Sequence, residues 1–133
     1  MAYQTAKFAV EGFSEVLANE VKPFGVDVII VEPGAFRTDW QGSSMQLHPA
    51  APDYDQTVGE MNRMREETNG PQPGDPARGA RIIVDVVRAP QPPRRLLLGA
   101  QAVVMARDAA AVRAAELEQW ADTSRAADYP AEQ

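Results

Sequence analysis

Residues 3–38 read YQTAKFAVEGFSEVLANEVKPFGVDVIIVEPGAFRT, and this stretch decides the fold. Its first part, residues 3–22, repeats apolar side chains at helical spacing and contains no proline, which predicts a helix. Residues 26–32 form a nearly continuous β-branched run, the pattern of a strand that is covered on both faces. Pro33 and Gly34 end that strand. Strands of this kind belong to parallel sheets, so the stretch predicts an α/β fold.

The rest of the chain continues this alternation. Asp75 and Pro76 form a helix start, with a capping residue followed by proline at the first helical position. Residues 35–73 show no sustained period, which predicts a long substrate loop with a short helix from Tyr54 to about Glu67. The further elements that we expect are a helix over 76–88, a strand over 94–98, a helix over 101–120 and a polar tail from Thr123.

The composition excludes several classes of function. The 133 residues predict a single domain, and no apolar run approaches the ~18 residues that suggest a membrane span. With no basic and apolar signal pattern at the start, we expect a cytoplasmic protein with no membrane partner. A net charge of −6 argues against a nucleic-acid partner. The chain has no cysteine and a single histidine, His48, so we expect no metal site. His48 could touch the substrate, but a lone loop histidine is more often simply solvated.

Tyr3 and Lys7 are the residues that suggest chemistry. Four residues apart on a helix, they project from the same face one turn apart. The lysine cation favours the phenolate form of the tyrosine, so the pair could donate a proton to a carbonyl oxygen or remove one from an alcohol. Taken alone, the Tyr-x-x-x-Lys pattern more often marks an exposed tyrosine and a solvated lysine on a surface helix.

The order of several landmarks changes that balance. The Tyr3-to-Lys7 helix, the buried strand and the segment from Pro33-Gly34 to Thr38 together resemble the short-chain dehydrogenase/reductase family, whose signature joins these three features in this order. The resemblance is most specific over residues 3–38 and is looser beyond. It implies that residues 1–133 are the C-terminal part of a Rossmann-like, doubly wound parallel sheet in a domain of ~250 residues.

The resemblance also implies roles for individual residues. Tyr3 would be the catalytic acid/base, and Lys7 would assist Tyr3 and hydrogen-bond the nicotinamide ribose. Backbone groups near Phe36 and the Thr38 hydroxyl would hold the carboxamide or a phosphate oxygen. The cofactor-binding residues would then be Tyr3, Lys7, Pro33, Gly34, Phe36 and Thr38. The cofactor would be NAD or NADP, the substrate a small alcohol or carbonyl compound, and the partner a second copy bound through the Tyr-bearing helix.

Candidates for the substrate wall lie in the loop. Trp40 is our first choice for a wall of the substrate pocket, although it could equally be a core anchor. Five further apolar side chains could line the same pocket or simply pack against the domain: Met45, Leu47, Tyr54, Met61 and Met64.

Two features of the family are missing. The sequence contains no Gly-x-x-x-Gly-x-Gly turn, and only two residues precede Tyr3, where the family's catalytic serine would lie about a dozen residues earlier. We therefore expect this chain alone to be inactive. The alternative hypothesis is a non-catalytic, truncated remnant that serves as an oligomerisation or interaction module, using Phe8, Phe13 and Leu17 of the Tyr-bearing helix.

Overall fold

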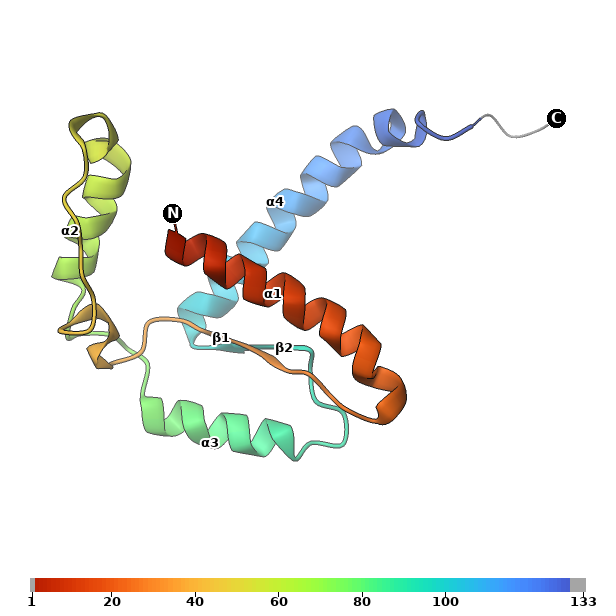
Figure 1. Ribbon diagram of the computed structural model, residues 1–133, viewed down its shortest axis with the longest axis horizontal. Helices are drawn as coiled ribbons and strands as arrows, with labels where there is room; N and C mark the ends of the chain where they lie inside the picture. Colours follow the sequence, from red (N-terminus) through yellow and green to blue (C-terminus); the bar gives the residue numbers. More distant parts are fainter. Residues whose placement is uncertain (1, 130–133) are drawn as a thin grey trace.

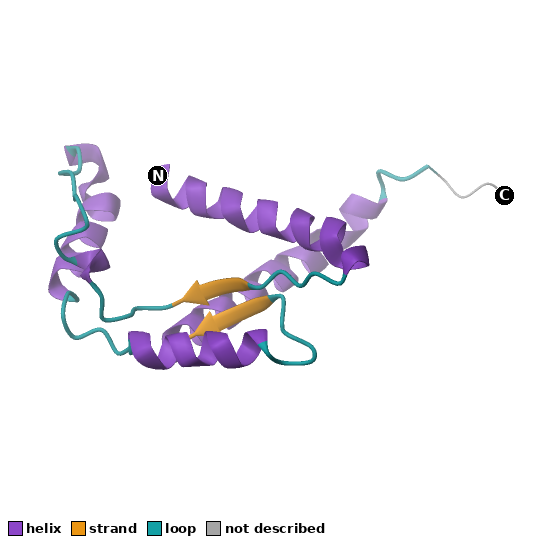
Figure 2. Ribbon diagram, turned by 60° about the horizontal axis from the view of Figure 1, so that its bottom comes forward, coloured by secondary structure: helices purple, strands orange, loops and turns teal. Residues whose placement is uncertain are grey.

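A small parallel sheet lies between two helices in the computed structural model, which describes residues 2–129. The strands β1 (Ile30–Pro33) and β2 (Arg95–Leu98) pair in parallel, with Ile30 opposite Arg95 and Pro33 opposite Leu98. Helix α1 (Ala2–Val21) and helix α3 (Pro76–Val87) lie on opposite sides of the strands (Figures 1 and 2). This arrangement confirms the α/β class.

Short-range chemistry sets the ends of α1 and α3. The Asp75 carboxylate caps α3 by accepting hydrogen bonds from the amides of Ala77 at 2.8 Å and Arg78 at 3.3 Å. Helix α1 ends at Val21, where Pro23 turns the chain into the 3-10 segment η1 (Lys22–Phe24). Gly25 follows with φ of 71°, a left-handed conformation that glycine adopts without strain.

The first strand is shorter than expected and begins later. The strand expected over 26–32 is corrected to Ile30–Pro33 because only these four residues face β2. A strand forms where backbone hydrogen bonds can pair, and β2 itself has only four residues, Arg95–Leu98, against the expected 94–98. In the described part of the chain, residues 26–29 have no partner strand, although three of the four are β-branched.

The last helix is longer than expected. Helix α4 (Ala100–Arg125) extends well beyond the 101–120 expected, so the polar tail expected from Thr123 is also corrected. The Ser124 hydroxyl donates to the Trp120 carbonyl at 3.0 Å, and Arg125 pairs with Asp122 at 2.7 Å, so both polar side chains find partners within the helix. The far end of α4 points away from the sheet (Figure 1).

The loop expected over 35–73 contains several short helical segments. It holds η2 (Asp39–Gln41), η3 (Pro52–Tyr54), a π-helical turn η4 (Asp55–Gly59) and helix α2 (Glu60–Glu67). The helix expected over 54–67 therefore begins as a π turn. An ion pair of 3.0 Å between Arg63 and Asp55 ties α2 back to that turn.

The described core is small for the length of the chain. Its buried apolar side chains are Ala18, Ile30 and Leu98. The solvent-accessible surface is 11194 Å², whereas a compact protein of this mass exposes about 6900 Å². Much apolar surface beside the sheet is therefore left uncovered. Within residues 2–129, no helix has both the length and the apolar character that crossing a bilayer requires.

Candidate active site

The carboxyl ends of β1 and β2 open into a hollow of about 720 Å³. We call it the strand-end hollow. Parallel strands place their carboxyl ends at one edge of a sheet, where ligands of open α/β sheets bind. The six proposed cofactor-binding residues and the first-choice substrate residue Trp40 all line this hollow: Tyr3, Lys7, Pro33, Gly34, Phe36, Thr38 and Trp40. The structure therefore brings them together from α1, the end of β1 and the loop that follows.

Tyr3 lies between Lys7 and Trp40. The Lys7 ammonium is 5.5 Å from the centroid of the Tyr3 ring, within the range of a cation–π interaction. The Trp40 ring centroid is 5.7 Å from that of Tyr3, with the two planes tilted by 47°. Tyr3 remains 50% exposed and Trp40 46% exposed. Both aromatic rings are thus fixed by neighbours while keeping surface that a ligand can contact.

The backbone of Phe36 keeps a donor and an acceptor available. Phe36 forms an isolated parallel bridge with Gly74, in which the Gly74 amide donates to Ala35 and the Arg37 amide donates to Gly74. In a parallel bridge of this kind, the amide and carbonyl of the central residue point to the opposite edge. The N–H and C=O of Phe36 are therefore not used by this bridge.

Two glycines make room for the Phe36 ring, and the sequence reasoning missed both. A Cβ atom on Gly79 would lie 2.7 Å from the Phe36 Cε1 atom, and one on Gly74 would lie 2.8 Å from its Cγ atom. These distances are far inside ordinary carbon contacts. Gly79 lies inside an amphipathic helix, where glycine lowers helix stability. A glycine at such a position indicates that a side chain would not fit there, and this was the signal available in the sequence.

Thr38 and Gly34 line the hollow and also stabilise the local structure around it. The Thr38 hydroxyl accepts a 3.4 Å hydrogen bond from the Trp40 amide and caps η2, which leaves its own proton for another acceptor. A Cβ on Gly34 would meet the Leu98 carbonyl at 3.3 Å and the Ala102 Cβ at 3.4 Å. Gly34 thus lets the end of β1 approach β2 and α4 closely.

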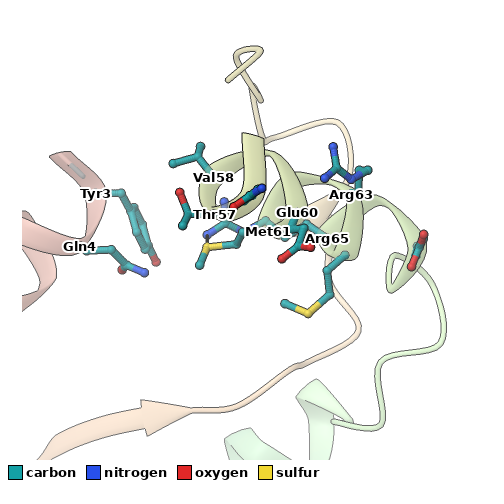
Figure 3. Close-up of a pocket in the computed structure, with 11 residues that line it drawn as sticks. Tyr3, Gln4, Thr57, Val58, Glu60, Met61, Arg63 and Arg65 are labelled. Carbon is teal, nitrogen blue, oxygen red and sulfur yellow. Dashed lines mark hydrogen bonds between the residues drawn. The ribbon is translucent and has the colours of Figure 1, made fainter. Parts of the chain in front are cut away.

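A second hollow, of about 820 Å³, also borders Tyr3. We call it the loop hollow, because Tyr3 and Gln4 of α1 face η4 and α2 of the loop across it (Figure 3). Its lining includes Met61 and Met64, which are 45% and 57% exposed. The other three apolar candidates, Met45, Leu47 and Tyr54, line neither hollow. The exposed His48 also lines neither.

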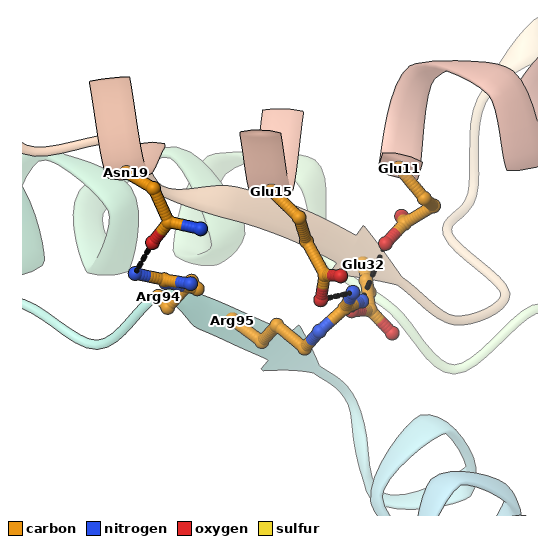
Figure 4. A network of polar contacts seen from close by, with 6 residues as sticks. All are labelled: Glu11, Glu15, Asn19, Glu32, Arg94 and Arg95. Atoms are coloured by element: carbon orange, nitrogen blue, oxygen red, sulfur yellow. Dashed lines mark hydrogen bonds and ion pairs between the residues drawn. The ribbon is translucent and has the colours of Figure 1, made fainter. Parts of the chain in front are cut away.

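A polar network on the sheet was not foreseen from the sequence. Arg95 of β2 pairs with Glu15 of α1 at 2.5 Å and with Glu32 of β1 at 2.6 Å, and it also pairs with Glu11 of α1 (Figure 4). The hydrogen bond from Arg95, reinforced by its charge, lowers the pKa of the Glu15 carboxyl. The bonds to Glu15, Glu32 and Glu11, in that order, raise the pKa of Arg95. Sequence distances of 63 to 84 residues explain why no local pattern revealed this network.

Comparison with known proteins gives consistent matches. A family model described as short chain dehydrogenase matches residues 1–47. The oxidoreductase BOA17 of Botryotinia fuckeliana is 44% identical over 125 residues, which cover 94% of this chain and 46% of that protein. An uncharacterized oxidoreductase of Schizosaccharomyces pombe is 32% identical over 98 residues, covering 73% of this chain and 33% of that protein.

A solved structure agrees with these matches. The crystal structure of a short-chain dehydrogenase from Streptomyces avermitilis superposes with a TM-score of 0.82 and 39% sequence identity. The superposition covers 96% of this chain and 46% of that chain. The chain therefore spans less than half the length of these relatives.

Proposed function

Because the chain belongs to the short-chain dehydrogenase family, we propose that it forms the catalytic part of an NAD(P)-dependent oxidoreductase acting on an alcohol or carbonyl compound. The observation that carries this proposal is the meeting of Tyr3, Lys7 and Thr38 in one hollow at the strand ends. An assembly module would not need these three side chains around one open space.

The residues around the strand-end hollow suit a nicotinamide. The unused N–H and C=O of Phe36 offer one donor and one acceptor, the complement of a carboxamide. Lys7 offers ammonium donors to ribose hydroxyls, and Thr38 keeps a hydroxyl proton. When bound, the nicotinamide would supply or accept the hydride. NAD and NADP would both satisfy these contacts.

Tyr3 would handle the proton on the substrate oxygen. In reduction its hydroxyl would donate to the developing alkoxide, and in oxidation its phenolate would take the proton of the alcohol. Lys7, one turn along α1, would keep its ammonium beside the Tyr3 ring, 5.5 Å from the ring centroid. Trp40 would limit where the oxygen can sit beside Tyr3.

The loop hollow would take the body of the substrate. It adjoins Tyr3, so a substrate whose oxygen contacts Tyr3 could extend toward Met61 and Met64. Methionine side chains adapt to irregular apolar shapes, which suits an apolar substrate body.

Tyr3→Phe in the whole protein tests the proposal. Turnover of a panel of secondary alcohols and ketones, followed by nicotinamide absorbance, should fall by about 10²-fold or more because the proton relay is lost. Binding of NADH and NADPH, followed by nicotinamide fluorescence, should change little. Tyr54→Phe is the matched control, since Tyr54 lines neither hollow. Turnover of Tyr3→Phe within a few-fold of the parent would contradict the proposal.

The alternative is an oligomerisation module without chemistry. It is favoured by Phe8 and Phe13 of α1, which are 76% and 66% exposed and would suit pairing with a second copy. The same Tyr3→Phe variant separates the two proposals, because a module would keep its assembly and have no turnover to lose.

A further inference from the structure

Tyr3 and Lys7 belong to a row of side chains on α1 whose later members contact residues 94 and 95. Residues four apart on a helix form a ridge along its surface. On α1 this ridge runs through Tyr3, Lys7, Glu11, Glu15 and Asn19. Its first two members line the strand-end hollow, Glu11 and Glu15 contact Arg95 of β2, and Asn19 contacts Arg94, the residue just before that strand. The ridge therefore has a ligand-facing end and an anchored end.

Arg95 joins three elements at the anchored end. Its guanidinium contacts Glu11 and Glu15 of α1 and Glu32 of β1 from its own place on β2 (Figure 4). The planar guanidinium presents several donors in a fixed geometry, which a point charge cannot reproduce. The neighbouring Arg94 makes one contact with α1, a 3.1 Å hydrogen bond to Asn19.

We infer that Arg95 is a positioning residue, which holds the ridge of α1 so that Tyr3 and Lys7 face the strand-end hollow. The inference rests on the catalytic role proposed for Tyr3. At 1.5 Å of rise per residue, Tyr3 lies about 12 Å along the helix axis from Glu11. Over that length, a tilt of α1 by about 5° at the anchor would displace Tyr3 by about 1 Å.

Charge explains why Arg95 cannot be replaced by a neutral side chain. Glu11, Glu15 and Glu32 gather around this one guanidinium. Without it, three carboxylates repel one another between α1 and the sheet. These side chains are between 30% and 49% exposed, so the individual pairs add little stability. The main effect of Arg95 is thus on the orientation of α1.

The position of Tyr3 can be measured without any substrate. The protein is labelled with fluorotyrosine at its three tyrosines, and the Tyr3 resonance is assigned with Tyr3→Phe. Trp40→Phe then gives the position of that resonance without the nearby indole ring, which lies 5.7 Å away. In Arg95→Gln the Tyr3 resonance should move toward this Trp40→Phe position, and the Tyr54 and Tyr129 resonances should stay.

Two variants serve as comparisons. Arg94→Gln, which loses one hydrogen bond to α1, should leave the Tyr3 resonance in place. Arg95→Lys keeps the charge and should shift the resonance part of the way. With a substrate from the panel, Arg95→Gln should lower kcat/KM by about 10²-fold, the cost of a misplacement near 1 Å.

The outcomes separate this inference from the proposed function. An unmoved Tyr3 resonance in folded Arg95→Gln overturns the inference, whatever the turnover. If Arg95→Gln does not fold, an unmoved resonance in Arg95→Lys overturns it in the same way. A moved resonance together with an active Tyr3→Phe enzyme supports the anchor and contradicts the proposed function.

Discussion

Gly79→Ala should force the Phe36 ring out of its place. The new Cβ would lie 2.7 Å from Cε1 and 3.2 Å from Cζ of Phe36, against about 3.5–4.0 Å for an ordinary carbon contact. The ring must therefore move by about 1 Å. Overpacking of this kind costs about 1–3 kcal/mol of unfolding free energy, while alanine returns about 1 kcal/mol of helix propensity. The expected net loss is about 0–2 kcal/mol.

Gly12→Ala provides the matched control. Gly12 also lies inside a helix, but a Cβ there would meet nothing within 4 Å. The propensity gain is common to both variants, so their difference of about 1–3 kcal/mol isolates the contact with Phe36. Urea unfolding followed by circular dichroism measures the unfolding free energy of both variants. In a Phe36→Ala background the difference should vanish. Equal stability of Gly79→Ala and Gly12→Ala, with Phe36 present, would refute the reasoning.

Two further predictions concern the helix cap and the anchor. Asp75→Ala should lower the unfolding free energy by about 1 kcal/mol because two amides of α3 lose their acceptor. Asp75→Asn retains a capping oxygen and should keep most of that free energy, as measured by the same urea unfolding. The pKa of Glu15 lies below its usual 4.5 in the folded state. The stability that its pairing with Arg95 contributes is therefore present above pH 4.5 and is lost as the pH falls through the pKa of the folded protein. Glu15→Gln should therefore flatten the stability profile in that acid range, and an unchanged profile would count against the pairing.

Elements with local causes could be predicted from the sequence. The start of α3 depends on Asp75 and Pro76, which are adjacent to the helix that they begin. The start of β1 could not be predicted in this way. Val26, Val28 and Ile29 have side chains as suitable for a strand as those of residues 30–31, and the four-residue partner β2 decides which residues pair. The preference of residues for an extended conformation is local, but the length of the strand depends on its partner strand.

The candidate site also has parts that the sequence predicts and parts that it does not. Tyr3 and Lys7 are brought to one face by helix geometry alone. Pro33 ends β1 and Gly34 follows it, at the sheet edge where ligands of open parallel sheets bind. The contact between Phe36 and Gly79 joins residues 43 positions apart in the sequence, and no spacing rule reaches that far. The family resemblance supplied the residues of the hollow, whereas their supports became visible only in the structure.

The two supports act on opposite sides of the strand-end hollow. Gly79 of α3 leaves the space that the Phe36 ring occupies, on one side of the sheet, and Arg95 holds the Tyr-bearing ridge from β2, on the side of α1. Both lie far beyond residue 38 in the sequence, after the motifs proposed to carry the chemistry. A Tyr-x-x-x-Lys helix followed by a Pro-Gly-x-x-x-Thr segment therefore specifies the reacting groups but not their separation. That separation depends on the later residues, because they fix α1 and the Phe36 backbone to the same sheet.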